Sequence, residues 1–385
     1  MQRIFGNLAR AAVYVAAAAC FQSSLAQEPD SNTVIEPYKV GTYETGNRRF
    51  VGVVLRDRFV IDISTASEVF AQRLNLTGGA IPSEMIDFIE GYDVYRSRVY
   101  AIVNDLVASG DADAWPDYVH DLDAIRTRAP ILYPGKILNA AVNFYTHVNE
   151  TGTPEEIAEA RRQRRVNRGV PYLFLKPSRG AVIGNGEQIV IPWGRDEIDW
   201  EVELGTVIGS TAKYVSAADA QDYIFGYMVT LDISDRGGRP PGGAPFQTDW
   251  FVGKGHDTFA PQGPWIVPKE FYGDPMENLR QTLSVDGEQM QEARAGDMIH
   301  SLYELIEYAS SVITLHPGDV VNNGTSGGVG MGTAVRGEQR YLRAGEEIVA
   351  TIDGIGTLRM PVVAGPQPAE ATGARLPPTS DYRQR

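Results

Sequence analysis

The chain has 385 residues, a length that fits one large domain or two. Apolar residues make up 43% of it and charged residues 22%, so the chain can bury a sizeable core and is not disordered as a whole. The 35 basic and 49 acidic residues give a formal charge of −14, which argues against nucleic acid or an anionic membrane surface as a partner. Cysteine occurs once, at Cys20, which excludes an internal disulfide framework and a thiolate metal cluster.

Residues 1–26 have the pattern of a secretory signal peptide. Arg3 and Arg10 supply the positive end, a short apolar run follows, and residues 24–26 offer small side chains before a cleavage site. The run is shorter than the roughly 20 apolar residues that span a bilayer. We therefore expect export to the bacterial periplasm, without stable membrane insertion after cleavage. An uncleaved N-terminal anchor and a lipid-modified Cys20 are the alternatives.

Residues 38–130 predict a small N-terminal α+β unit. Short apolar runs alternate there with Gly, Asn and Asp turn signals, which is typical of strands. A helix is expected over 83–107, because apolar residues recur at helical spacing and Gly110 follows. Pro130 and Pro134 mark the join to the next domain. The expected strands lie at 38–40, 49–54 and 59–61.

Residues 136–363 predict a strand-dominated domain, since many short β-branched runs are separated by Gly and Pro. Two helices are expected within it, an Arg-rich insert at 154–168 and a second helix at 301–312. The tail 365–385 is rich in Pro, Ala and polar residues and is expected to be mobile. The predicted fold class is therefore α+β with strands in the majority.

The most informative stretch is 199–209, in which acidic and apolar residues alternate. A strand sends alternate side chains to opposite faces, so Asp199, Glu201 and Glu203 are expected on one face of a half-buried strand. Two carboxylates about 7 Å apart on such a strand repel each other and lose hydration. Either their pKa values rise or a cation compensates them.

A further acid, Asp232, is expected inside the otherwise apolar strand 227–234, although aspartate is depleted from strands. A solvated face on an edge strand is the alternative explanation for these acids. Three carboxylates without cysteine or clustered histidine are hard oxygen ligands, which suit Mg²⁺, Mn²⁺ or Ca²⁺ better than zinc or copper. Glu201, Glu203 and Asp232 are therefore the candidate metal ligands.

An ordered set of motifs runs through the same region. It comprises 143–150 (NFYTHVNE), 174–177 (FLKP), 199–204 (DWEVEL), 232–236 (DISDR), 253–258 (GKGHDT), 317–320 (PGDV), 324–330 (GTSGGVG) and 352–356 (IDGIG). The set resembles the fumarylacetoacetate hydrolase family over about residues 136–363, and the preceding small unit is similar to the family's N-terminal region.

The resemblance implies a mixed β-sandwich roll and a homodimer. It implies a divalent metal, usually Mg²⁺ with Mn²⁺ or Ca²⁺ as alternatives, held by Glu201, Glu203 and Asp232. It further implies an enzyme that cleaves a C–C bond in a small 1,3-diketo or 2-oxo acid, such as an acylpyruvate or a fumarylacetoacetate-like compound. Decarboxylation of a β-keto acid and hydration or isomerisation are the alternative reactions of the same family.

The motifs also supply candidate catalytic residues. His147 and Glu150 are three residues apart and can meet on one face of a helical turn, so that Glu150 orients the imidazole that acts as base. Lys254 is the family-matched candidate for stabilising or protonating the departing carbanion. The non-catalytic alternatives are that His147 is a hydrogen-bonded structural histidine at a loop–helix junction and that Lys254 is an exposed surface lysine.

The resemblance implies three substrate-binding residues. Arg236 would pair with a substrate carboxylate, because a guanidinium fork fits that group, although a salt bridge to Asp235 is the alternative. Thr325 lies in a glycine-rich loop whose backbone N–H groups would approach a substrate anion. Tyr145 belongs to the same motif as His147. The role of His256, inside the Lys254 motif, stays open.

Two segments leave the substrate undecided. The pattern of the Arg-rich insert 155–168 is typical of a solvated helix face, and a lid over a dianionic substrate is the alternative. The long loop 236–247 could change the size of the pocket. Two other classes of protein remain as alternatives. One is a non-catalytic periplasmic protein that binds a metal or ligand, and the other is an acidic β-domain that binds calcium structurally.

Overall fold

The computed structural model describes residues 32–74, 80–110, 112–150, 152–240, 249–336, 339–370, 373 and 375–382. The expected signal peptide, residues 1–26, lies outside them. The α-helices are α1 (Ile63–Leu74), α2 (Met85–Glu90), α3 (Tyr92–Ser109), α4 (Pro154–Val166), α5 (Trp250–Lys254), α6 (Lys269–Tyr272), α7 (Pro275–Asn278) and α8 (Leu302–Val312). Among the residues described, no helix is both long enough and apolar enough to cross a bilayer.

The strands outnumber the helices, which confirms the predicted strand-dominated α+β class. They are β1 (Lys39–Thr45), β2 (Arg48–Leu55), β3 (Phe59–Asp62), β4 (Val119–Asp121), β5 (Arg126–Thr127), β6 (Ile137–Ala140), β7 (Leu173–Lys176), β8 (Val182–Ile183), β9 (Ile189–Ile191), β10 (Ile198–Asp199), β11 (Val202–Ile208), β12 (Ile224–Leu231), β13 (Ser234–Asp235), β14 (Ala260–Pro268), β15 (Arg280–Val285), β16 (Glu288–Arg294), β17 (Val320–Asn322), β18 (Glu347–Ile352) and β19 (Gly356–Ala364).

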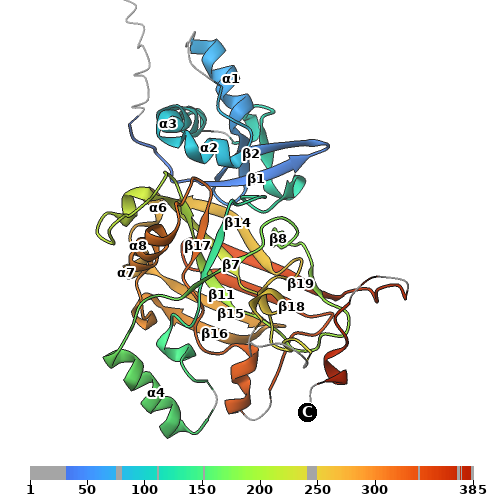
Figure 1. Cartoon of the computed structure of the whole chain (residues 1–385). Helices are drawn as coiled ribbons and strands as arrows, with labels where there is room; N and C mark the ends of the chain where they lie inside the picture. Colours follow the sequence, from blue (N-terminus) through green and yellow to red (C-terminus); the bar gives the residue numbers. More distant parts are fainter. Residues whose placement is uncertain are drawn as a thin grey trace, which may run out of the picture.

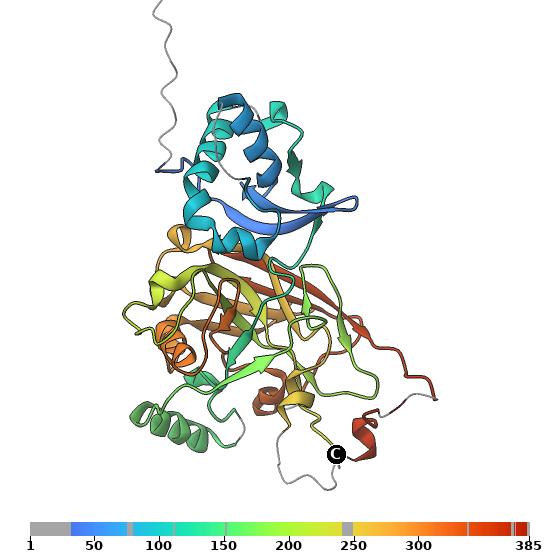
Figure 2. The same cartoon turned by 45° about the horizontal axis from the view of Figure 1, so that its top comes forward.

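Two sheets form the body of the molecule. The larger has 12 strands in the order β4-β3-β2-β1-β14-β12-β11-β17-β6-β7, with β5 paired to β1 and β8 to β14. The smaller has five strands in the order β16-β15-β18-β19-β9. Figure 1 shows α1, α2 and α3 gathered at one end of the molecule and α4 projecting at the other. The turned view in Figure 2 shows the same separation.

The strands of the N-terminal unit continue the large sheet. β1 pairs with β14, with Val40 opposite Ile266, so the unit and the following domain share one hydrogen-bonded ladder. The three predicted N-terminal strands are confirmed as β1, β2 and β3. Helix α1, which follows β3, was not among the expected elements.

The helix expected over 83–107 is two helices, α2 and α3, that meet at Gly91. A Cβ atom at this position would lie only 2.3 Å from the ring of Tyr95, so a larger residue there would require that ring to move. The helical spacing of the apolar residues persists through the break, which is why the sequence pattern missed it. The other two predicted helices are confirmed as α4 and α8, each started by a capping box, at Thr153 and Ser301.

The central strands are buried on both faces. Leu204 of β11 packs in the core between the two sheets, whereas Val207 of the same strand packs in a second core under α2 and α3. Phe225 of β12 meets Phe88 and Tyr92 edge to face in that second core. The expectation of a half-buried strand at 199–209 was therefore wrong, because the N-terminal helices cover the face that was taken as open.

Candidate active site

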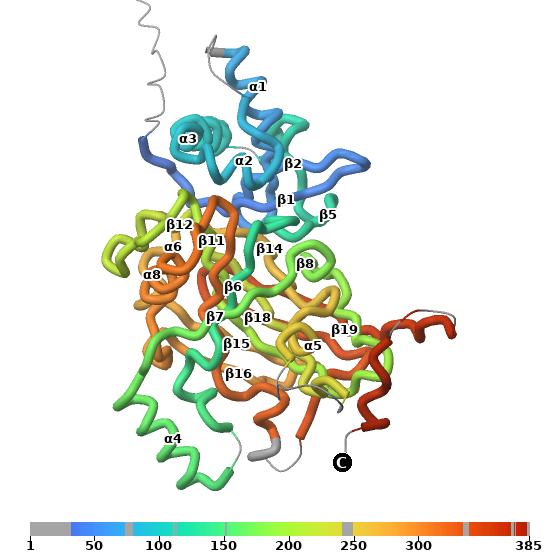
Figure 3. The backbone as a smooth tube through the Cα atoms, in the orientation of Figure 1, coloured from blue at the N-terminus to red at the C-terminus, as the bar shows by residue number. Residues whose placement is uncertain are grey.

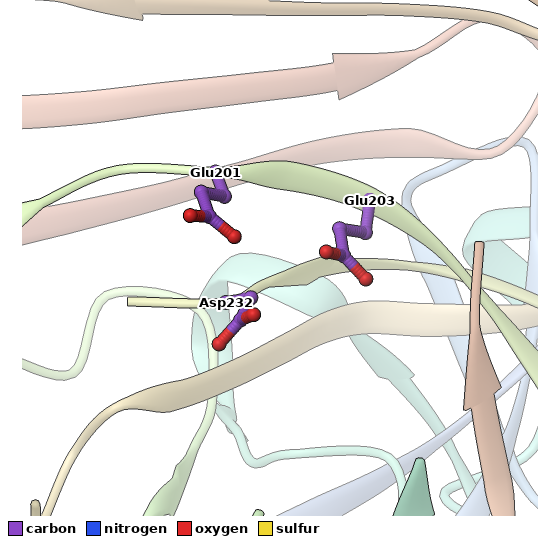
Figure 4. Close-up of side chains that lie close together, drawn as sticks. All are labelled: Glu201, Glu203 and Asp232. Carbon is purple, nitrogen blue, oxygen red and sulfur yellow. The ribbon is translucent and has the colours of Figure 1, made fainter. Parts of the chain in front are cut away.

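Three carboxylates meet where β11 begins and β12 ends. Glu201 directly precedes β11, Glu203 lies on it, and Asp232 directly follows β12. Because the two strands pair antiparallel, with Val202 opposite Leu231, these positions become neighbours. One oxygen of each acid lies within 4.8 Å of one oxygen of each of the others. Figure 4 shows the three side chains pointing toward a common space.

The alternation of β11 explains why the acids face this space. Val202 and Leu204 point into the core between the sheets, so Glu201 and Glu203 point to the opposite side. Asp232 is not inside a strand, as the sequence pattern suggested, because the ladder of β12 ends at Leu231. Its backbone N–H donates to the Glu201 carbonyl oxygen at 2.9 Å, which holds the two chain segments together.

Three cations compensate the buried acids. Lys254 Nζ donates to Asp232 Oδ2 at 2.6 Å and to Glu201 Oε2 at 3.0 Å. Lys176 donates to Asp232 Oδ1, and Arg236 donates to Glu201 Oε1. Burial raises the pKa of Glu201, but Lys254 and Arg236 outweigh that effect and hold the pKa well below its ordinary value. Glu201 is therefore a carboxylate in the folded chain.

Glu203 is compensated less well. Its Oε2 accepts from Asn139 Nδ2 at 3.3 Å and from the backbone N–H of Gly324 at 3.2 Å, while its buried Oε1 has no hydrogen-bond partner among the described residues. Burial, with the charges of Asp232 and Glu201, raises the pKa of Glu203 well above its ordinary value. A buried oxygen without a partner, beside two further carboxylates, is a donor set that fits a hard divalent cation.

A histidine–carboxylate pair stands beside the acids. His147 ends a 3₁₀ turn (Tyr145–His147), and its Nδ1 is hydrogen-bonded to Glu150 Oε1. Glu150 Oε2 accepts the backbone N–H of Gly328 at 2.7 Å. The charge of His147 also lowers the pKa of Glu201, which places the imidazole within electrostatic reach of the acids. The predicted pair thus forms, and it lies within electrostatic reach of the predicted metal ligand Glu201.

Comparison with known proteins assigns the chain to a family. Residues 136–363 match the family model described as fumarylacetoacetate (FAA) hydrolase C-terminal. The chain belongs to the fumarylacetoacetate hydrolase family. This confirms the resemblance drawn from the motifs, and with it the expectation of an enzyme.

Relatives in this family include hydrolases and a tautomerase. A 2,4-didehydro-3-deoxy-L-rhamnonate hydrolase of Sphingomonas sp. (strain SKA58) is 36% identical over 62% of this chain and 76% of its own length. The oxaloacetate tautomerase YisK of Bacillus subtilis (strain 168) is 31% identical over 83% of this chain and 98% of its own. The crystal structure of maleylpyruvate hydrolase from Sphingobium sp. SYK-6, in complex with manganese(II) and pyruvate, aligns with a TM-score of 0.60 at 26% identity, covering 85% of this chain and all of that one.

The glycine-rich loop of this family member orients side chains of the site. The N–H groups of Gly324 and Gly328 donate to Glu203 and Glu150, and that of Met331 donates to Asp199 at 3.1 Å. Gly328 has φ +99°, and a Cβ atom there would lie 2.1 Å from the Met290 carbonyl oxygen, so only glycine fits. These N–H groups bind the protein's own carboxylates.

The three expected substrate-binding residues each contact other groups of the protein in this structure. Thr325 donates its hydroxyl to the Val202 carbonyl oxygen at 2.9 Å and accepts from Gln291. The Tyr145 ring lies 3.9 Å from the Arg165 guanidinium of α4. Arg236 binds Asp199 and Glu201, so the alternative of a salt bridge to Asp235 does not apply.

Residues with site contacts that sequence reasoning missed include Lys176, Asn139 and Gln291. Lys176 is buried, and its ammonium reaches both Asp232 and the Ile233 carbonyl oxygen. The sequence feature that could have indicated Lys176 is a lysine at the end of an apolar strand. The contacts of Asn139 with Glu203 and of Gln291 with Thr325 join distant segments of the chain, and no local pattern marks them.

Proposed function

We propose that the chain is a divalent-metal-dependent hydrolase that cleaves a C–C bond in a small 1,3-diketo or 2-oxo acid. The observation that carries the proposal is the buried set of Glu201, Glu203 and Asp232, together with the His147–Glu150 pair within electrostatic reach. In the part of the chain that the structure describes, Glu203 Oε1 has no hydrogen-bond partner. A buried acid cluster alone would fit a structural ion. The adjoining base adds what catalysis requires.

Glu201, Glu203 and Asp232 would hold the ion, for which we propose Mg²⁺, with Mn²⁺ as its closest substitute and Ca²⁺ as an alternative. When bound, such an ion stabilises negative charge on the oxygens of an oxo acid. The remaining chemistry belongs to the protein's own side chains.

His147 is the proposed base. Its Nδ1 is bound to Glu150, which leaves Nε2 to take a proton from water or from the substrate. Glu150 stabilises the imidazolium that results, and the N–H of Gly328 holds Glu150 in position. The pair therefore has the arrangement of other catalytic sites in which a carboxylate orients the histidine that acts as the base.

Lys254 is the proposed acid or electrostatic partner for the departing carbanion. Burial lowers the pKa of its ammonium, but Asp232 and Glu201 outweigh that effect and raise it, so the group stays charged. Arg236 is the proposed partner of a substrate carboxylate, and for this role it must exchange one of its present partners, Asp199 or Glu201.

A reaction within the same family that leaves the carbon chain intact is the second candidate. The relative YisK, an oxaloacetate tautomerase, aligns over 98% of its own length, which supports proton transfer on an oxo acid as an alternative. Decarboxylation of a β-keto acid uses the same groups. In each case His147 would exchange a proton with a carbon or oxygen beside a carbonyl.

A chelator-controlled screen tests the proposal. Acylpyruvates, maleylpyruvate, oxaloacetate and related acids are incubated with Mg²⁺, with Mn²⁺, with Ca²⁺ or with EDTA, and products are identified by mass spectrometry and NMR. We expect turnover with metal, loss in EDTA, and loss in Glu201→Gln and His147→Ala but not in the exposed control Glu68→Gln. Binding without turnover would instead favour a non-catalytic protein that binds a metal or ligand. No turnover with any ion, together with a melting temperature that rises with Ca²⁺ alone, would favour a structural calcium site.

Export and self-association also belong to the proposal. Cell fractionation tests the periplasmic location, and N-terminal sequencing of the mature protein tests cleavage after Ala26. Light scattering tests the homodimer. It is supported by the free edge of β7 in the part of the large sheet that the structure describes, where Leu175 is exposed.

A further inference from the structure

The C-terminal tail docks at the same end of the molecule as α5, away from α1, α2 and α3 (Figures 2 and 3). It lies beyond residues 136–363, which match the family model. Thr379 is buried, and its backbone N–H and hydroxyl both donate to the Gly194 carbonyl oxygen, at 2.7 and 3.1 Å. Gly194 has φ +75°, and a Cβ atom there would lie 2.8 Å from the Cα of Pro378. The turn at Gly194 is therefore shaped to seat the tail.

Tyr382 links this tail to a buried arginine. Its hydroxyl accepts from Arg195 and donates to the Gly238 carbonyl oxygen at 3.1 Å. Arg195 also donates to the Gly238 carbonyl oxygen at 2.6 Å and makes a two-pronged pair with Asp235, at 2.6 and 2.9 Å. The side chains of Arg195 and Asp235 are 1% and 0% exposed, so the pair is shielded from solvent. We call Tyr382, Arg195 and Asp235 the clamp.

Asp235 joins two segments that carry the cations of the active site. It accepts the backbone N–H of Gly237 at 2.9 Å and is hydrogen-bonded to His256 Nε2 at 3.0 Å. Arg236, the next residue, reaches the acid cluster, and Lys254 lies two residues before His256. His256, whose role the sequence left open, thus contacts the clamp through Asp235.

The same two segments are cross-linked elsewhere. Arg239 pairs with Asp249 at 3.4 Å, and Asp249 caps α5, the helix that ends at Lys254. The backbone N–H of Arg236 donates to the Glu197 carbonyl oxygen at 2.9 Å, which fixes Arg236 against the chain that leads into β10. The positions of Arg236 and Lys254 therefore depend on contacts outside the acid cluster. Of the two ion pairs among these contacts, the Arg195–Asp235 pair of the clamp is more buried than Arg239–Asp249.

We propose that Tyr382 is a positioning residue, which acts through Arg195 and Asp235 to hold Arg236 where it meets a substrate carboxylate. This inference rests on the proposed function. It assigns to the tail an indirect role in substrate binding. Among the contacts described, Tyr382 touches neither the acid cluster nor the His147–Glu150 pair.

The test is Tyr382→Phe in the full-length chain, with Tyr303→Phe as matched control. Tyr303 also hydrogen-bonds through its hydroxyl, to Asp274 at 2.8 Å, but lies on α8. Loss of one hydrogen bond to a charged group predicts a rise of about tenfold in KM for the best oxo acid. Because this weakens ground-state and transition-state binding alike, kcat should change by less than about twofold. Tyr303→Phe should match the wild type in KM.

A second readout does not depend on activity. Hydrogen–deuterium exchange of the amides of 235–240 and 249–256 should quicken in Tyr382→Phe and in a chain ending at Gly373, while the amides of β11 keep their wild-type rates. If the shortened chain does not fold, the point variant alone decides. Wild-type KM together with wild-type exchange in Tyr382→Phe would overturn the clamp. If the wild type turns over no oxo acid, the proposed function fails, but the exchange rates still test the clamp.

Discussion

The ammonium of Lys254 lies 2.6 Å from Asp232 Oδ2, at the place where the proposed metal ion would draw on the same carboxylate. Lys176, Lys254 and Arg236 thus compensate acids that a divalent ion would also compensate. The cations would therefore compete with a bound ion for the same carboxylates, so each cation should influence metal affinity.

Replacing Lys254 by Met should tighten metal binding and abolish turnover. The variant removes a positive charge that competes for Asp232 and Glu201, so the dissociation constant for Mn²⁺ should fall, as measured by isothermal titration. The metal-free variant should lose unfolding free energy, by at most about 3–5 kcal/mol, since Asp232 and Glu201 each lose one of their two buried cationic partners. Lys136→Met is the control, because it breaks a lysine–aspartate pair at Asp319, outside the site. Weaker Mn²⁺ binding in Lys254→Met would contradict this picture.

Glu203 predicts a pH dependence of stability in the ion-free protein. Its raised pKa means that the folded chain keeps a proton which the unfolded chain releases near pH 4.3, about the ordinary value for glutamate. The unfolded state then binds fewer protons, so this group's contribution to stability falls as the pH rises from that value toward the folded pKa.

Glu203→Gln removes this dependence. In urea unfolding with EDTA, the unfolding free energy of the variant should increase relative to that of the wild type as the pH rises from about 4.5 to 8. Glu68→Gln, an exposed substitution, should follow the wild type throughout. A constant difference between Glu203→Gln and the wild type over this range would show that Glu203 is ionised in the folded chain.

The His147–Glu150 pair predicts a separation of metal binding from turnover. His147→Gln should reduce kcat by about 10²- to 10⁴-fold, the usual contribution of a general base, and leave the Mn²⁺ dissociation constant within about threefold. Glu150→Gln should give a smaller loss of kcat, because the imidazole remains. Retention of wild-type kcat in His147→Gln would remove His147 from the mechanism.

Gly328 allows a test of the loop that holds Glu150. Gly328→Ala places a methyl group 2.1 Å from the Met290 carbonyl oxygen, so the N–H that binds Glu150 must move. We expect a loss of kcat of at least about tenfold, comparable to one hydrogen bond to a charged group. Gly345→Ala is the control, since Gly345 has a similar φ of +100° but no atom of the described residues within 4 Å of the added Cβ. Wild-type kcat in Gly328→Ala would contradict this role of the Gly328 N–H, and an equal loss of kcat in Gly345→Ala would attribute the effect to backbone strain.

The sequence predicted the acid cluster because its signals are local. The alternation from Asp199 to Glu203 puts two acids on one side of β11, and hard oxygen ligands favour a small set of metals whatever the fold. Helices α4 and α8 were predictable for a similar reason, since their capping residues lie beside them in the chain. The family motifs then indicated His147, Glu150 and Lys254, and the structure places all three beside or within reach of the acids.

What the sequence did not reveal depends on contacts between distant segments. The second buried face of β11 exists only because α2 and α3 pack on it. Lys176 reaches Asp232 across 56 residues, and Tyr382 reaches Arg195 across 187. The tail was expected to be mobile from its composition, which carries no information about the seat at Gly194.

The most direct measurement is Mn²⁺ binding followed by electron paramagnetic resonance on the metal-free protein. We expect one ion per chain in the wild type, and loss of that site in Glu201→Gln, Glu203→Gln and Asp232→Asn, while Glu68→Gln binds as the wild type does. Undiminished binding in all three acid variants would contradict the assignment of the cluster as the metal centre.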